Sequence, residues 1–151
     1  MAIRYFAVAA GIVYALVGLL GFVPGLNAER PPEAPDLAIE SFYGYLLGLF
    51  PVNLLHNLVH LAIGAWGIVA YSRGIPGARA FARGLAILYG VLTILGLVPG
   101  LNTLFGLVPL HGHDVWLHAV TAAAAAYFGW IHRMDVGDRV RDHTGDLIGR
   151  H

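Results

Sequence analysis

Four long apolar segments limit what this chain can fold into. They run over about Tyr5–Val23, Val52–Tyr71, Ala80–Val98 and Leu110–Trp130. Each has about the 20 residues that a helix needs to cross the hydrocarbon core of a bilayer, and Asp114 is the only Asp, Glu or Lys within them. Only 12% of the 151 residues are charged, about half the share in a soluble domain. The sequence therefore predicts an all-α integral membrane protein with four transmembrane helices.

The charged residues collect between and after these segments. Arginine supplies all nine basic residues, and eight of them are Arg4, three in the second loop, 72–83, and four in the tail. The first loop, 27–40, holds Arg30 with four acidic residues and is acidic overall. Cytoplasmic loops carry the excess of basic residues, so we expect a multi-pass protein of the inner (plasma) membrane with both termini cytoplasmic. The formal net charge of zero argues against nucleic acid as a partner. The expected partners are the lipid bilayer and either other membrane proteins or a second copy of the chain.

An internal repeat divides the chain into two helix hairpins. Without a gap, residues 48–60 align with 106–118, and residues 14–27 align with 89–102. Two helices return the chain to its starting side of the membrane. The tandem repeats, about 5–72 and 80–131, should therefore have the same orientation and be related by a pseudo-twofold axis along the membrane normal. We expect one transmembrane domain over residues 1–131 and a cytoplasmic tail over 132–151.

Two local patterns concern how the helices are connected and packed. The apolar stretches 41–50 and 103–108 are too short to span a bilayer. Irregular backbone at depth needs protein around it, so we expect helical pieces that lie in the outer interface. Small residues at near-helical spacing would allow close helix contact. These residues are Gly64, Gly67, Ala119 and Ala123.

The repeat also superimposes residues of the types that ligate metals. His60 aligns with His118, and His56 aligns with Asp114. The two residues on each helix are four apart and share one face. Twofold symmetry would therefore place His60 opposite His118 and His56 opposite Asp114, near the outer leaflet. Three imidazoles and one carboxylate suit a transition metal such as zinc, and iron, copper or nickel accept the same ligands.

Other interpretations of the same residues stay open. His111 and His113 are peripheral to the set and would deliver or supplement a metal. The four side chains could instead form a hydrogen-bonded network that joins the halves, because ionisable groups in membrane segments face the bundle interior and pair. Axial ligation of a haem by His60 and His118 is disfavoured, since the other two side chains would crowd the ring.

The four candidate ligands are not accompanied by an arrangement of residues that is typical of an enzyme. Neither helix has the Glu beside a His that zincin peptidases need, and the chain contains no cysteine and no nucleophile motif. The sequence therefore names no substrate or reaction. A non-enzymatic membrane subunit or scaffold is the alternative function.

The segment Pro-Val-Asn-Leu-Leu-His-Asn-Leu-Val-His-Leu, residues 51–61, and the segment 114–118 carry a family resemblance. They resemble the small bacterial four-helix membrane proteins known only as domain of unknown function 4383. The resemblance covers roughly Met1 to Trp130. It implies a membrane fold and brings no activity, substrate or cofactor with it.

Overall fold

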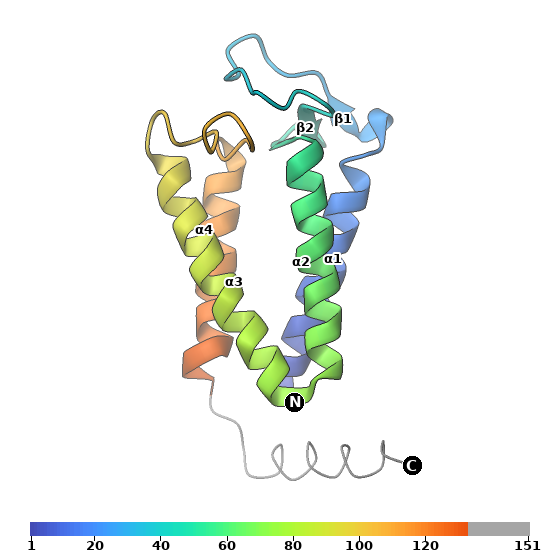
Figure 1. The fold of residues 1–151 in the computed structure, drawn as a ribbon, viewed down its shortest axis with the longest axis vertical. Helices are drawn as coiled ribbons and strands as arrows, with labels where there is room; N and C mark the ends of the chain where they lie inside the picture. The colour runs from blue at the N-terminus through green and yellow to red at the C-terminus, as the bar shows by residue number, and fades with distance from the viewer. Residues whose placement is uncertain (133–151) are drawn as a thin grey trace.

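The computed structural model describes residues 1–132, which form four helices arranged as two pairs (Figure 1). The helices are α1 Ala2–Leu20, α2 Leu54–Ser72, α3 Gly74–Leu97 and α4 His113–Ala126, and α4 continues as a π-helical turn, η2, Tyr127–Ile131. α1 packs mainly along α2, and α3 packs mainly along α4. The pairs meet near the turn between α2 and α3 and lie farther apart at the other end. The four predicted helices are present, and the predicted tail lies outside the described residues except for His132.

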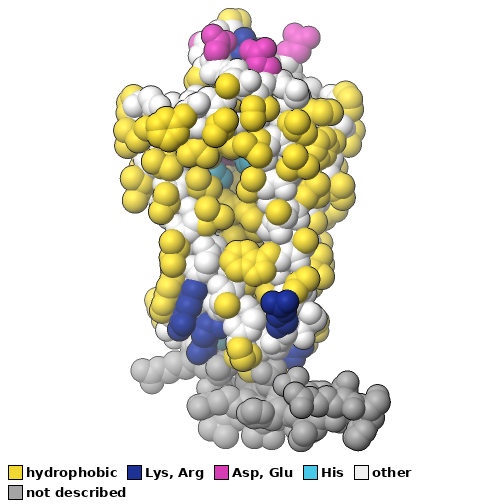
Figure 2. All heavy atoms as spheres, viewed as in Figure 1, with side chains coloured by type: hydrophobic (Ala, Val, Ile, Leu, Met, Phe, Trp, Pro, Cys, Tyr) yellow, Lys and Arg dark blue, Asp and Glu magenta, His cyan; other side chains and the backbone are white. Residues whose placement is uncertain are grey.

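Three of these helices are long and apolar enough to cross a membrane, namely α1, α2 and α3. The 14 residues of α4 are too few to cross alone. Figure 2 shows hydrophobic side chains over the middle of the molecule, with acidic side chains at one end and arginines near the other. These features indicate a membrane protein whose apolar helices contact the lipid bilayer. A fourth span and the twofold relation between the halves stay predictions.

Glycines allow α1 and α2 to approach closely. A Cβ atom added to Gly64 would lie 2.6 Å from the backbone nitrogen of Ala15, and one added to Gly67 would lie 2.7 Å from a carbonyl oxygen of α1. Cβ atoms do not tolerate such distances, so larger residues at these positions would force the helices apart. The predicted role of Gly64 and Gly67 is confirmed for this helix pair, whereas Ala119 and Ala123 are exposed.

The outer loop contains a small antiparallel sheet where the sequence predicts an interfacial helix. A short helix η1, Pro24–Leu26, precedes the strands β1 Asn27–Ala28, β2 Gly44–Leu46 and β3 Phe50–Val52, in the order β1-β2-β3. Positive φ angles at Leu47 and Gly48 reverse the chain between β2 and β3, and Pro51 is tolerated because β3 is an edge strand. Residues 103–108 form turns. The prediction of interfacial helices is wrong, because strand pairing and turns satisfy the backbone groups of these stretches instead.

A tight turn joins the two helix pairs. Arg73 is the residue between α2 and α3, and Gly74, with a φ of +70°, begins α3. Pro76 follows in the first turn of α3, where its missing N–H costs no helical hydrogen bond. The basic loop predicted over 72–83 is therefore mostly helix.

The hydrophobic core fills the arginine-rich end of the bundle. Ile3, Ala7, Phe81, Leu85 and Tyr89 are among its members and are almost fully buried. This packing joins α1 and α3 and closes that end of the space between the pairs.

Candidate metal centre

Asn53 fixes the start of α2 and therefore the position of His56. Its side chain accepts a hydrogen bond of 2.9 Å from the backbone N–H of His56, the N-cap contact that satisfies a free donor at the start of a helix. The same side chain donates to the carbonyl oxygens of Ile39, at 3.0 Å, and Leu107, at 2.8 Å. Asn53 thus ties both outer loops to the first turn of α2.

The first two turns of α4 carry the other predicted ligands. The helix begins at His113, after Gly112 with a φ of +66°. Asp114 lies in the first turn, where the helix dipole favours a carboxylate. His118 lies one turn later on the same face.

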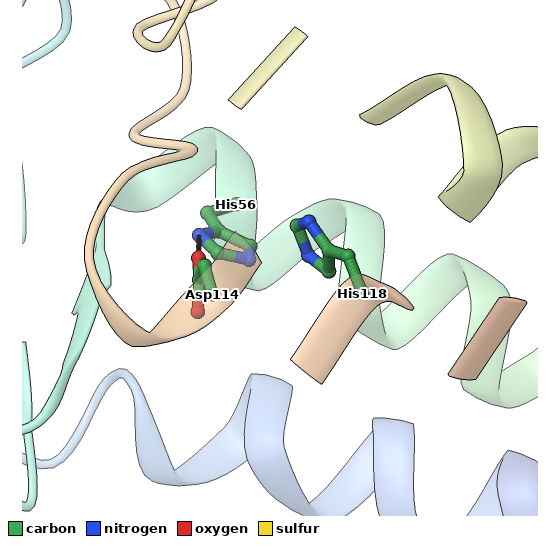
Figure 3. Close-up of side chains that lie close together, drawn as sticks. All are labelled: His56, Asp114 and His118. Carbon is green, nitrogen blue, oxygen red and sulfur yellow. Dashed lines mark ion pairs between the residues drawn. The ribbon is translucent and has the colours of Figure 1, made fainter. Parts of the chain in front are cut away.

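His56, Asp114 and His118 form a compact group between the two helix pairs (Figure 3). The Nδ1 atom of His56 lies 3.8 Å from the Oδ2 atom of Asp114, so these two residues face each other as the repeat alignment predicts. The three residues each offer one ligand atom, and these atoms lie within 4.8 Å of one another. The residues are 4%, 3% and 3% exposed. A buried His/Asp/His group of this size could hold a metal ion.

Polar atoms of this group lack hydrogen-bond partners in the protein. The atoms are Nδ1 of His56, His60 and His118 and Oδ2 of Asp114. The 3.8 Å between the facing side chains is too long for a hydrogen bond, and both side-chain polar atoms of Asn57 are also unpartnered. Among the described residues, hydrogen bonds therefore do not close the polar network that the sequence allows as an alternative. Each such atom costs roughly 1–3 kcal/mol, a cost that a shared ligand would offset.

His60, the fourth predicted ligand, lies beside the group. Its ring centre is 4.4 Å from that of His56 and 5.3 Å from that of Tyr14 in α1. His60 thus contacts α1 through Tyr14, and the structure brings the other three ligands closer together.

The two peripheral histidines lie outside the group. His111 is next to the ring of Tyr45, with ring centres 6.2 Å apart, and burial lowers the pKa of its imidazole. His113 is exposed, and its Nδ1 atom accepts a hydrogen bond of 3.0 Å from the Trp116 indole. His113 is thus engaged at the surface of α4.

Two tyrosines that the sequence pattern of candidate ligands does not identify lie next to these histidines. Tyr14 contacts His60, and Tyr89 contacts His118 with ring centres 4.8 Å apart. The two tyrosine rings are themselves 5.4 Å apart. Both tyrosines begin the aligned segments 14–27 and 89–102, so the repeat contains the signal that could have found them.

Paired apolar helices around a buried His/Asp group define a small helical membrane protein. Within that class, the chain belongs to the family described as domain of unknown function (DUF4383), which matches residues 4–131. The resemblance carried by residues 51–61 and 114–118 is thereby confirmed. No curated protein and no solved structure matches the chain.

Proposed function

We propose that this multi-pass membrane protein binds a transition metal through His56, Asp114 and His118, with His60 as a further candidate ligand. One observation supports the proposal above the others. Three buried side chains from both helix pairs bring ligand atoms within 4.8 Å of one another while carrying unpartnered polar atoms.

The ligand types and distances fit zinc or iron(II). Zinc binds imidazole nitrogen and carboxylate oxygen at about 2.0–2.2 Å in a tetrahedral arrangement, so two atoms that share one ion lie roughly 3.3–3.6 Å apart. The pair at 3.8 Å is close to this span, and separations of up to 4.8 Å need a closure of roughly 1.2 Å, which side-chain rotation supplies. Both three-ligand zinc sites and iron sites with two His and one carboxylate keep an open coordination position.

The proposal includes a location in the outer half of the inner (plasma) membrane, with both termini cytoplasmic. The 14 residues of α4 and the 5 of η2 together measure about 28 Å at 1.5 Å per residue, close to the thickness of the hydrocarbon core. Among the described residues, every arginine except Arg30 lies near the end that holds the N-terminus and the α2–α3 turn, which the positive-inside rule assigns to the cytoplasm.

The proposal also relates the two hairpins by a pseudo-twofold axis along the membrane normal. The contacts Tyr14–His60 and Tyr89–His118 join aligned positions of the two repeats and support this relation. Under it, the ligands come from equivalent places in the two halves.

Metal analysis of detergent-purified protein tests the proposed site. We expect about one equivalent of zinc or iron per chain, strongly reduced in His118→Ala and in the isosteric Asp114→Asn. His113→Ala is the matched control, because His113 is on the same helix but is exposed and bonded to Trp116. Metal that persists in both ligand variants, or its absence from wild-type protein purified with added zinc and iron(II), contradicts the proposal.

A further inference from the structure

A cavity of about 240 Å³ lies beside the His/Asp group, between α1 and α4. Its walls are mostly apolar, but they include His60, Asp114 and His118, each nearly fully buried and each with an unpartnered polar atom. The volume exceeds the about 150 Å³ that admits benzene to an apolar protein interior. The cavity therefore has room for a ring-sized molecule and polar atoms to orient it.

The cavity opens toward the side of the bundle. Val13 of α1 and Val120 of α4 line it, and they are 56% and 58% exposed on the apolar exterior. A second cavity, of about 180 Å³, reaches His60 and His118 between α2 and α3. Figure 2 shows histidine side chains within a hollow between hydrophobic ones. In a bilayer these openings face lipid.

Buried side chains fill both ends of the described part of the bundle. At the outer end Val108 and Leu110 are buried, and Asn53 binds both outer loops. At the other end the core residues Phe81 and Leu85 are fully buried. A molecule that reaches the His/Asp group therefore enters sideways.

We infer that the cavity between α1 and α4 binds a small, uncharged, lipid-dissolved molecule with an oxygen acceptor, the chemical class to which quinone rings belong. Of the residues that the structure describes, no Lys or Arg lines the cavity to pair with an anion. The Tyr14 hydroxyl donates a hydrogen bond of 3.3 Å to the Thr121 hydroxyl, which leaves the Thr121 O–H and the imidazole N–H groups as donors suited to an oxygen. This inference extends the proposed function and rests on it in one respect. A metal ion held by the His/Asp group would bind the oxygen of the same molecule at its open coordination position.

Photolabelling in phosphatidylcholine vesicles tests entry from the bilayer. The probe is an apolar phenyl diazirine, which partitions into the lipid. We expect it to label Leu85 and Tyr89, which line the cavity but are otherwise buried, together with the exposed Ile12. Phe81 is equally buried but lies outside the cavity and should stay unlabelled. Labelling of Ile12 without Leu85 and Tyr89 overturns the inference.

Two competitors test recognition of the oxygen. Menadione is a two-ring quinone, and 2-methylnaphthalene has the same ring system without oxygen. We expect menadione to protect Leu85 and Tyr89 at about tenfold lower concentration in the lipid, the effect of about one hydrogen bond. Labelling of Ile12 corrects for light absorbed by the competitor, and the chain has no cysteine to which menadione would add. Equal protection by the two competitors contradicts the inference that the cavity recognises an oxygen acceptor.

A matched pair of variants tests the position of the entrance. Ala124→Phe adds a ring at the exposed rim of the cavity lining and should reduce labelling of Leu85, whereas Ala123→Phe changes the adjacent position, which is equally exposed but outside the lining, and should not. If both variants label as the wild type does, the entrance is elsewhere and the inference fails. Should Ala124→Phe not fold, the competition with wild-type protein decides.

Metal content of the same samples separates the two proposals. Bound metal without labelling of the cavity contradicts the lipid-side ligand and leaves the metal site intact. Labelling and menadione protection without metal contradict the metal site and support the ligand site.

Discussion

The glycine contact between α1 and α2 predicts a stability change of defined sign. Gly64→Ala adds a Cβ atom 2.6 Å from the backbone nitrogen of Ala15, whereas ordinary contact begins at 3.4 Å. The two helices must therefore separate by up to about 0.8 Å. Overpacking of this kind costs about 1–3 kcal/mol, and Ala returns about 0.5–1 kcal/mol through its better helix propensity. We expect a net loss of roughly 0–2.5 kcal/mol in the free energy of unfolding, centred near 1 kcal/mol.

Gly90→Ala is the matched control for this prediction. A Cβ atom at Gly90 in α3 meets nothing within 4 Å, so we expect unchanged stability or a gain of up to about 1 kcal/mol from helix propensity. Unfolding by SDS in mixed micelles, followed by circular dichroism, measures both variants. If Gly64→Ala is as stable as Gly90→Ala, the backbones of α1 and α2 are not held at this distance, and the packing argument is refuted.

Three further predictions concern the cap, the orientation and the surface. Asn53→Ala removes the N-cap bond and both loop contacts, so it should lower the free energy of unfolding by about 1–2 kcal/mol. Asn53→Asp keeps the cap acceptor but sets a buried carboxylate oxygen against both loop carbonyls, so it should lose at least as much in the same assay. A reporter inserted near Glu33 should be accessible from outside and one fused after His151 from the cytoplasm; an external signal after His151 contradicts the arginine argument. Asp36→Asn breaks the 2.9 Å ion pair with Arg30 but should leave the unfolding midpoint unchanged, because water screens this exposed pair, and a clear shift would contradict that view.

The repeat alignment predicts which residues meet but not how closely each one approaches. His56 and Asp114 face each other because the gap-free register places them at equivalent depths in two helices. His60 lies about 6 Å farther along α2 than His56 and is outside the three-residue group. Whether that offset still reaches a shared ion depends on how the two helices cross. This crossing angle is set by the packing of whole helix faces, and the spacing of the histidines does not predict it.

The outer loops were harder to predict than the helices for a related reason. Residues 41–50 are short and apolar without a clear helical or strand period, so composition alone does not decide between an interfacial helix and a strand. The outcome depends on β1, which pairs with β2 across the long acidic loop, Asn27 with Leu46. The long apolar segments do not depend on a distant partner in this way, since a helix forms its backbone hydrogen bonds within itself.

The division of the ligands between the two helix pairs bears on how the chain is made. His56 belongs to the hairpin that leaves the ribosome first, whereas Asp114 and His118 belong to α4, later in the chain. α1 and α2 can dock through their glycines as soon as both are inserted, but the imidazole of His56 then still lacks its carboxylate neighbour. The donor set becomes complete only when α4 arrives. A chain truncated before Asp114 would therefore enter the bilayer with a His56 imidazole that has no partner from α4.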